Sequence, residues 1–105
     1  MLFIIPFGYG FLEKVYHNAL ILELKYREIP VEHQKKLVVC YRNESVGEFV
    51  PDIIVDGRVI VEVKSTEDHV SAFEAQLLNY LKATNLKVGL LINFGRSVQV
   101  KRMVL

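Results

Sequence analysis

The chain has 105 residues, of which 51% are hydrophobic and 24% are charged, a balance typical of one globular domain over residues 1–105. Its formal net charge is only +1, so the strong basic excess common in nucleic-acid-binding domains is absent. A single cysteine, Cys40, excludes an internal disulfide and favours a reducing compartment. No apolar run approaches the ~20 residues that span a bilayer, so we expect a cytoplasmic protein with no membrane segment.

Residues 11–28 are expected to form the first helix. Apolar side chains recur there every four residues and would share one helical face: Leu12, Tyr16, Leu20 and Leu24. Gly8 and Gly10 precede the segment, and Ile29-Pro30 follows it, where the proline resists continuation of the helix.

Three antiparallel strands are expected next. Residues 35–42 and 46–55 are typical of strands, and a turn at Asn43-Glu44 would join them. Asp56-Gly57 is a strong hairpin signal. The β-branched run over residues 58–64 that follows it is therefore expected to pair with residues 46–55.

A second helix and two strands complete the chain. Ser71 and Glu74 have the spacing of a capping box, which predicts a helix from Ser71 through Ala83. Residues 88–94 and 99–104 are then expected to form strands joined by a turn. This order of helix, three strands, helix and two strands predicts a mixed α/β (α+β) fold with helices packed on a sheet.

Glu62 and Lys64 are candidate functional residues because of their position in the third expected strand. Residues two apart on a strand point to the same face, so these side chains project together. The strand is otherwise apolar, which is typical of a central strand covered on both faces. Charged groups in such a strand are costly unless they pair, bind a metal or line a cleft. An ion pair between Glu62 and Lys64, with Asp52 in a loop, is the alternative to a functional site.

The face of Asp52 depends on the hairpin loop. With a two-residue loop, Asp52 lies opposite Val61 and points away from Glu62. With a three-residue loop that ends at a left-handed Gly57, it lies opposite Ile60, on the same face as Glu62. A functional site therefore predicts a bulge at Gly57.

Two carboxylates and a lysine on one face suit the hydrolysis of a phosphodiester. Oxygen ligands favour magnesium, which polarises a phosphoryl group and makes a bound water more acidic. The ammonium of Lys64 can orient that water or stabilise the developing negative charge. The pattern thus predicts a metal-dependent phosphodiester-cutting site.

Pro51-Asp52, followed by Glu62-Val63-Lys64 after nine intervening residues, resembles the PD-(D/E)xK nuclease motif. The resemblance implies a restriction-endonuclease-like fold, in which helices flank a mixed sheet. It also implies a site for Mg²⁺, with Mn²⁺ as a substitute, formed by Asp52, Glu62 and the backbone carbonyl of Val63. Lys64 would assist the attacking water.

The segment from Gly10 to Tyr16 resembles the signature of the GxxExxY proteins, a small prokaryotic family in the same superfamily. This match implies that Glu13 joins the metal shell. The family usually has a further helix before the signature, and only nine residues precede Gly10 here. We therefore expect the N-terminal helix to be shortened or missing, which would leave an apolar face uncovered and favour a homodimer.

Gln76 and Tyr80 have the spacing of a QxxxY helix motif, which is found in several nuclease domains of the superfamily. The resemblance implies that Gln76 acts catalytically beside Lys64, and that Tyr16 and Tyr80 support the site or contact substrate. Both tyrosines are equally typical of core aromatics with the hydroxyl at the edge. The three histidines lack the spacing of metal ligands and are interpreted as surface or packing residues: His17, His33 and His69.

Together these features predict a magnesium-dependent nuclease that acts on DNA, with RNA as an open alternative. A catalytically inactive nuclease-fold module for binding or assembly is the second hypothesis, including a component of a defence or toxin–antitoxin system. The near-neutral charge and the short N-terminus favour this second hypothesis, and binding of a divalent metal would discriminate between the two.

Overall fold

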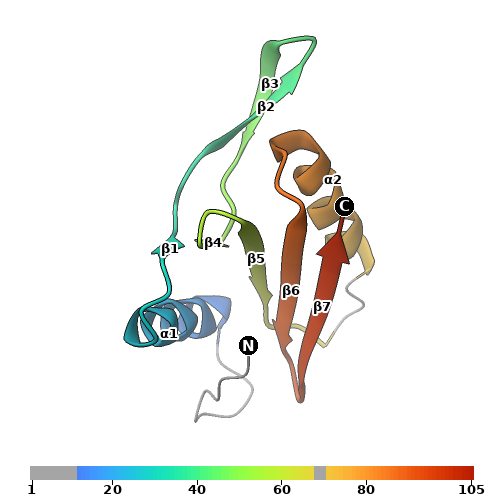
Figure 1. Ribbon diagram of the computed structural model, residues 1–105. Helices are drawn as coiled ribbons and strands as arrows, with labels where there is room; N and C mark the ends of the chain where they lie inside the picture. The colour runs from blue at the N-terminus through green and yellow to red at the C-terminus, as the bar shows by residue number, and fades with distance from the viewer. Residues whose placement is uncertain (1–11, 68–70) are drawn as a thin grey trace.

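The computed structural model describes residues 12–67 and 71–105. The expectation about the N-terminal helix, the glycine of the GxxExxY signature and His69 fall outside these ranges. Within them the chain forms two helices and seven strands (Figure 1). In chain order these are α1 (Glu13–Tyr26), β1 (Val31–Glu32), β2 (Leu37–Tyr41), β3 (Glu44–Phe49), β4 (Ile53–Val55), β5 (Val59–Lys64), α2 (Ser71–Thr84), β6 (Val88–Phe94) and β7 (Val98–Val104).

Helix α1 ends two residues earlier than expected, in a Schellman arrangement. Glu28 is left-handed, with φ 57°, and its N–H donates to the carbonyl of Lys25 at 3.0 Å. The N–H of Ile29 donates to the carbonyl of Leu24 at 3.0 Å, so carbonyls of the last turn are satisfied. Leu12 precedes the helix and is exposed, contrary to the expected periodicity. The buried residues of α1 are Tyr16, Leu20, Ile21 and Leu24.

Five strands form the main sheet, in the order β1-β4-β5-β6-β7. Strand β5 is therefore central, as its apolar run predicted. It is parallel to β6, whereas the other neighbouring strands are antiparallel. A parallel pair requires a crossover connection, and α2 provides it. Strand β1 was not expected, and its two residues pair with β4.

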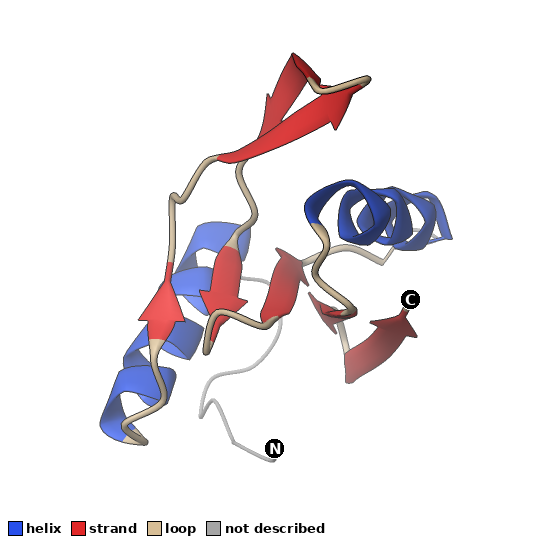
Figure 2. Cartoon of the chain, turned by 45° about the horizontal axis from the view of Figure 1, so that its top comes forward, coloured by secondary structure: helices blue, strands red, loops and turns tan. Residues whose placement is uncertain are grey.

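Strands β2 and β3 form a separate two-stranded sheet that projects beyond the main sheet (Figures 1 and 2). The prediction of one strand over residues 46–55 was wrong, because the chain changes sheet at Val50-Pro51-Asp52. Pro51 has no N–H to donate to a strand ladder, which explains the break at this point. Arg42 and Asn43 have φ values of 51° and 64°, as a tight hairpin turn requires.

The main sheet has a hydrophobic core on each face. On β5, Val61 and Val63 pack with α1, and Ile60 packs with α2. Because side chains alternate along a strand, Glu62 and Lys64 point to the side of α2. The buried residues on the α1 side include Leu20, Leu24, Ile53, Ile92 and Phe94. Those on the α2 side are Phe49, Ile60, Leu77, Leu81 and Leu91.

Helix α2 begins at Ser71 as expected and ends one residue later than predicted, at Thr84. Asn85 follows with φ 62°, a conformation common just past a helix end. Gly89 lets α2 approach β6 closely, since an added Cβ would lie 3.0 Å from the side chain of Leu77. No helix in the described ranges is both long enough and apolar enough to cross a membrane.

Candidate functional site

The β4–β5 hairpin sets the position of Asp52. Ile53 pairs with Val61, and Val55 pairs with Val59. Three residues lie between the last pair, and a hydrogen bond of 3.0 Å from the N–H of Arg58 to the carbonyl of Val55 closes the turn. Gly57 is left-handed with φ 64°, as predicted. The three-residue loop consists of residues 56–58, however, and not of the predicted residues 55–57. Val55 pairs with Val59, and Asp56 and Gly57, both with positive φ, form the turn.

This register differs by two residues from the predicted one. Continued by one residue, it sets Asp52 opposite Glu62 instead of Ile60. A shift of two residues leaves the face of a strand side chain unchanged. Asp52 and Glu62 therefore still share a face, and the predicted convergence of the two carboxylates holds.

The carboxylate of Asp52 is anchored to β5. Its Oδ2 accepts a hydrogen bond of 2.7 Å from the backbone N–H of Val63. Val63 lies between Glu62 and Lys64, so the bond ties Asp52 to the part of the strand that carries both other motif residues. The geometry thus brings Asp52, Glu62 and Lys64 together at one end of β5.

Glu62 carries an unsatisfied oxygen. Its Oε1 is buried, and no hydrogen-bond partner for it exists among the described residues. Burial raises the pKa of Glu62 to about 8, and the negative charge of Asp52 and a hydrogen bond with it act in the same direction, while Lys64 opposes them. A buried oxygen without a partner beside a second carboxylate is a donor set that fits a hard divalent cation.

Lys64 forms no ion pair in the described part of the chain. Its Nζ lies 4.4 Å from the centroid of the Phe73 ring, a cation–π contact with the first turn of α2. The ion pair with Glu62 that was the alternative to a functional site is therefore not present.

Gln76 and Tyr80 lie on α2, after Phe73. Nε2 of Gln76 donates to the hydroxyl of Tyr80 at 3.2 Å, so the two residues share one helical face as their spacing predicted. The ring of Tyr80 stacks on Phe49, with centroids 3.5 Å apart. Gln76 itself is exposed, one turn from the aromatic ring that contacts Lys64.

Glu13 lies on the other side of the sheet from Glu62. It lines a cleft of about 340 Å³ together with Lys14, Asn18, Gln34, His17, His33, Asp52 and Val63. Asp52 thus borders both the α1-side cleft and the neighbourhood of Glu62. Among the described residues, no three acidic, histidine or cysteine side chains lie close enough to form a metal-ligand group. The structure accordingly brings Asp52 near Glu13 and near Glu62, but does not gather all three.

Tyr16 belongs to the core. Its side chain is only 1% exposed, and its ring stacks on Phe94 with centroids 4.6 Å apart. This contact fixes the first turns of α1 against the end of β6. Tyr16 therefore supports the placement of Glu13 and does not face solvent.

His17 is a residue that sequence reasoning missed. Its Nε2 lies 3.0 Å from the backbone carbonyl oxygen of Asp52, so Nε2–H donates to that carbonyl. The bond joins α1 to the segment before β4, across 35 positions in the sequence. No spacing rule signals such a pair, because only the packing of α1 on the sheet brings the two residues together.

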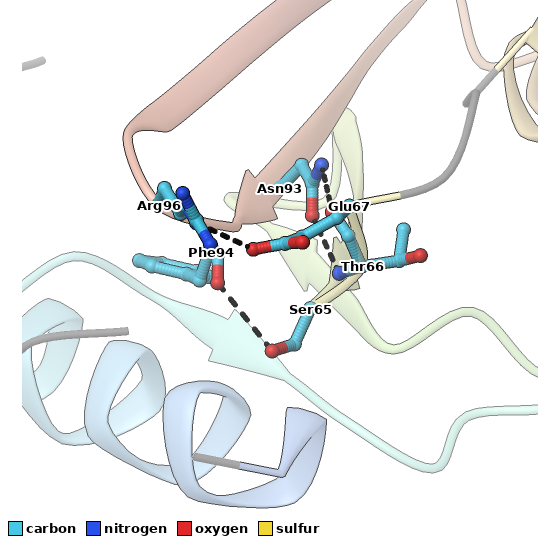
Figure 3. Close-up of polar contacts among 6 residues, drawn as sticks. All are labelled: Ser65, Thr66, Glu67, Asn93, Phe94 and Arg96. Atoms are coloured by element: carbon cyan, nitrogen blue, oxygen red, sulfur yellow. Dashed lines mark hydrogen bonds and ion pairs between the residues drawn. The ribbon is translucent and has the colours of Figure 1, made fainter. Parts of the chain in front are cut away.

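Asn93 is the second missed residue, and it fixes the chain that follows Lys64 (Figure 3). Its Oδ1 accepts from the N–H of Thr66 at 3.0 Å, and its Nδ2 donates to the carbonyl of Thr66 at 2.9 Å. Nearby, the hydroxyl of Ser65 donates to the carbonyl of Phe94 at 3.4 Å. The available signal was an asparagine inside an otherwise apolar strand.

Comparisons with known proteins concern the fold and the family of this chain. The fold resembles the crystal structure of SSO0001, with a TM-score of 0.65 over 87% of this chain and 16% sequence identity. The chain spans about half (48%) of the length of that protein chain. No curated protein matches the sequence. A family model described as the PD-(D/E)XK nuclease superfamily, whose members generally use divalent metals, matches residues 5–103. Since this match covers nearly all of the sequence, the chain belongs to the PD-(D/E)XK nuclease superfamily.

Proposed function

We propose that this protein is a divalent-metal-dependent nuclease that hydrolyses phosphodiester bonds of DNA. The observation that carries the proposal is the buried Oε1 of Glu62, which has no hydrogen-bond partner among the described residues. It lies beside the carboxylate of Asp52, with the ammonium of Lys64 on the same face. An apolar strand rarely keeps such groups unless a ligand completes them. Membership of the superfamily supports nucleic acid as the substrate.

Asp52, Glu62 and the backbone carbonyl of Val63 would hold Mg²⁺, with Mn²⁺ as a substitute. All three supply oxygen, the donor that Mg²⁺ prefers. A cation at this position supplies Lewis acidity toward a phosphoryl oxygen. It also stabilises the ionised form of Glu62, whose pKa is otherwise raised. Glu13 would support the site from the α1-side cleft, where it is near Asp52.

Lys64 is assigned the role of orienting the attacking water and stabilising negative charge on the phosphoryl oxygens. Its position over Phe73 limits the freedom of the long side chain, which favours one placement of the ammonium. Gln76, held by Tyr80, would assist the water or contact the substrate from α2. Hydrogen-bond donors fixed before reaction act without a reorganisation cost.

We further propose a family, a cellular location and an oligomeric state for this protein. The GxxExxY signature supports placement in that prokaryotic family, and the single cysteine supports a cytoplasmic location for one domain over residues 1–105. A homodimer and a preference for DNA over RNA are part of the same proposal. Cleavage of RNA is the alternative to this preference.

A second candidate is a nuclease-fold binding or assembly module without turnover, as in a defence or toxin–antitoxin system. Two observations favour it. The raised pKa of Glu62 leaves this group largely protonated at neutral pH in the absence of metal, and the described residues contain no group of three metal ligands. Metal binding discriminates between the candidates.

Calorimetric titration of Mg²⁺ and Mn²⁺ tests the proposal. Wild type and Lys64→Ala should both bind metal, whereas Asp52→Ala and Glu62→Ala should bind at least about 10-fold more weakly. In a parallel assay with single-stranded DNA, duplex DNA and RNA, Lys64→Ala should cut at least about 100-fold more slowly than wild type. A folded wild type that binds neither metal, even with DNA present, would support the inactive module.

A further inference from the structure

A second cavity lies on the α2 side of the sheet, beside the candidate site. It measures about 240 Å³, and it is formed by the first turns of α2 and by strands β6 and β7. Its polar lining residues are Glu74, Asn93, Gln99 and Lys101.

The strand register connects this cavity to the motif. Lys64 pairs with Asn93, which in turn pairs with Gln99 on β7. Two residues away on β5, Glu62 pairs with Leu91, and Leu91 pairs with Lys101. Residues paired across neighbouring strands share a face of the sheet. Gln99 and Lys101 therefore extend the same face on which Glu62 and Lys64 lie.

The distance between β5 and β7 fits a nucleic-acid strand that crosses the sheet over the candidate site. Strands β5 and β7 are separated by two interstrand spacings, about 10 Å in total. A nucleic-acid strand advances about 3.4 Å along its axis per phosphate, so this offset corresponds to about three nucleotides. A strand cut beside Glu62 and Lys64 would place a flanking phosphate over β7.

The cavity lining offers suitable donors for that phosphate. Lys101 forms no ion pair in the described ranges, and Lys101 and Gln99 both line the cavity. Asn93, which also lines the cavity, uses both atoms of its side-chain amide in hydrogen bonds to Thr66. Glu74, on α2, adds one negative charge to the lining, which should weaken binding of an anion. Neutralising this residue should therefore strengthen binding.

We propose that the cavity between α2 and β6–β7 binds a backbone phosphate of the nucleic-acid substrate, flanking the cleaved bond, through Lys101 and Gln99. This rests on the proposed nuclease function and adds to it the path of the substrate across the sheet. The contact is sequence-independent, because a phosphate carries no base information.

Arg102 provides a matched control for Lys101. It is the next residue on β7, it is exposed, and it also carries one positive charge. It pairs with Leu90, which packs in the core on the α1 side, so its side chain points to the opposite face. Long-range charge effects should be alike for both residues, whereas a local contact in the cavity should distinguish them.

The test measures binding of a fluorescent DNA oligonucleotide in Mg²⁺, with Lys64→Ala as the background so that the DNA is not cut. Lys101→Gln should weaken binding several-fold and lower the salt dependence by about one counterion. Arg102→Gln should leave both quantities unchanged, and Glu74→Gln should tighten binding. Melting curves check that each variant is folded.

Equal effects of Lys101→Gln and Arg102→Gln, or no effect of Lys101→Gln, would overturn the proposed phosphate site while leaving the nuclease function intact. Weaker binding by Glu74→Gln would do the same, because it would indicate a cationic ligand. Absence of DNA and RNA binding by the folded background protein would instead refute the nuclease proposal, and the phosphate site with it.

Discussion

The side chain of Asp52 accepts a hydrogen bond of 2.7 Å from the backbone N–H of Val63 across the β4–β5 hairpin. This bond holds Asp52 against β5, the strand that carries Glu62 and Lys64. The two carboxylates are therefore held close together.

Asp52→Asn separates the charge of this residue from its anchoring role. The amide oxygen can still accept from Val63, but one negative charge near Glu62 is lost. We expect Mg²⁺ affinity to fall by about 10- to 100-fold with little change in melting temperature. Calorimetry and thermal melting measure the two quantities. Unchanged metal affinity would show that Asp52 is not a ligand.

Glu62→Gln should change how stability depends on pH. In the metal-free protein, burial and Asp52 raise the pKa of Glu62 from the ordinary 4.5 to about 8. Between these values the folded chain retains a proton that the unfolded chain has released, so wild-type stability should fall as pH rises across this range and level off above it. The glutamine variant lacks this dependence.

In EDTA at pH 8.5, Glu62→Gln should therefore unfold with a free energy about 1–2 kcal/mol higher than wild type, whereas at pH 4 the two should be equal. Denaturant titrations at both pH values measure the difference. Addition of Mg²⁺ at pH 8.5 should stabilise wild type and not the variant. A variant as pH-dependent as wild type would mean that Glu62 ionises normally.

His17→Phe tests the bond from the imidazole to the backbone of Asp52. The ring is retained approximately in shape, but the donor at 3.0 Å from the Asp52 carbonyl is removed. We expect Mg²⁺ affinity to decrease by about 10-fold, because outer groups orient metal ligands. His33→Phe is the control, since His33 lines the same cleft without a hydrogen bond to Asp52. Equal losses in both variants would refute a positioning role for His17.

Asn93→Leu should destabilise the protein through the chain segment after Lys64. The substitution removes the two hydrogen bonds between Asn93 and the backbone of Thr66, at a cost of about 1–3 kcal/mol. Chemical denaturation measures the loss. Asn79→Leu, at an exposed position of α2, should cost far less. A small effect at Asn93 would mean that water replaces the amide.

Much of the local structure followed from the sequence alone. Four-residue periodicity and the Ile29-Pro30 stop located α1, and the apolar run of β6 was predicted at its exact bounds, residues 88–94. The expected strand over residues 58–64 predicted that Glu62 and Lys64 share a face of a central strand, as β5 shows. These features depend on neighbours a few positions apart, which the sequence displays directly.

Tertiary structure decided the pairing of distant segments. Residues 46–55 divide between two sheets, and the β4–β5 register places Asp52 opposite Glu62 and not opposite Ile60. The bond from His17 to Asp52 joins residues 35 positions apart. The sequence by itself determined that Glu62 and Lys64 share one face of a strand, because the periodicity of side chains is local. Packing of α1 and α2 on the sheet decided which residues meet, because strand register and helix docking depend on contacts that no local pattern encodes.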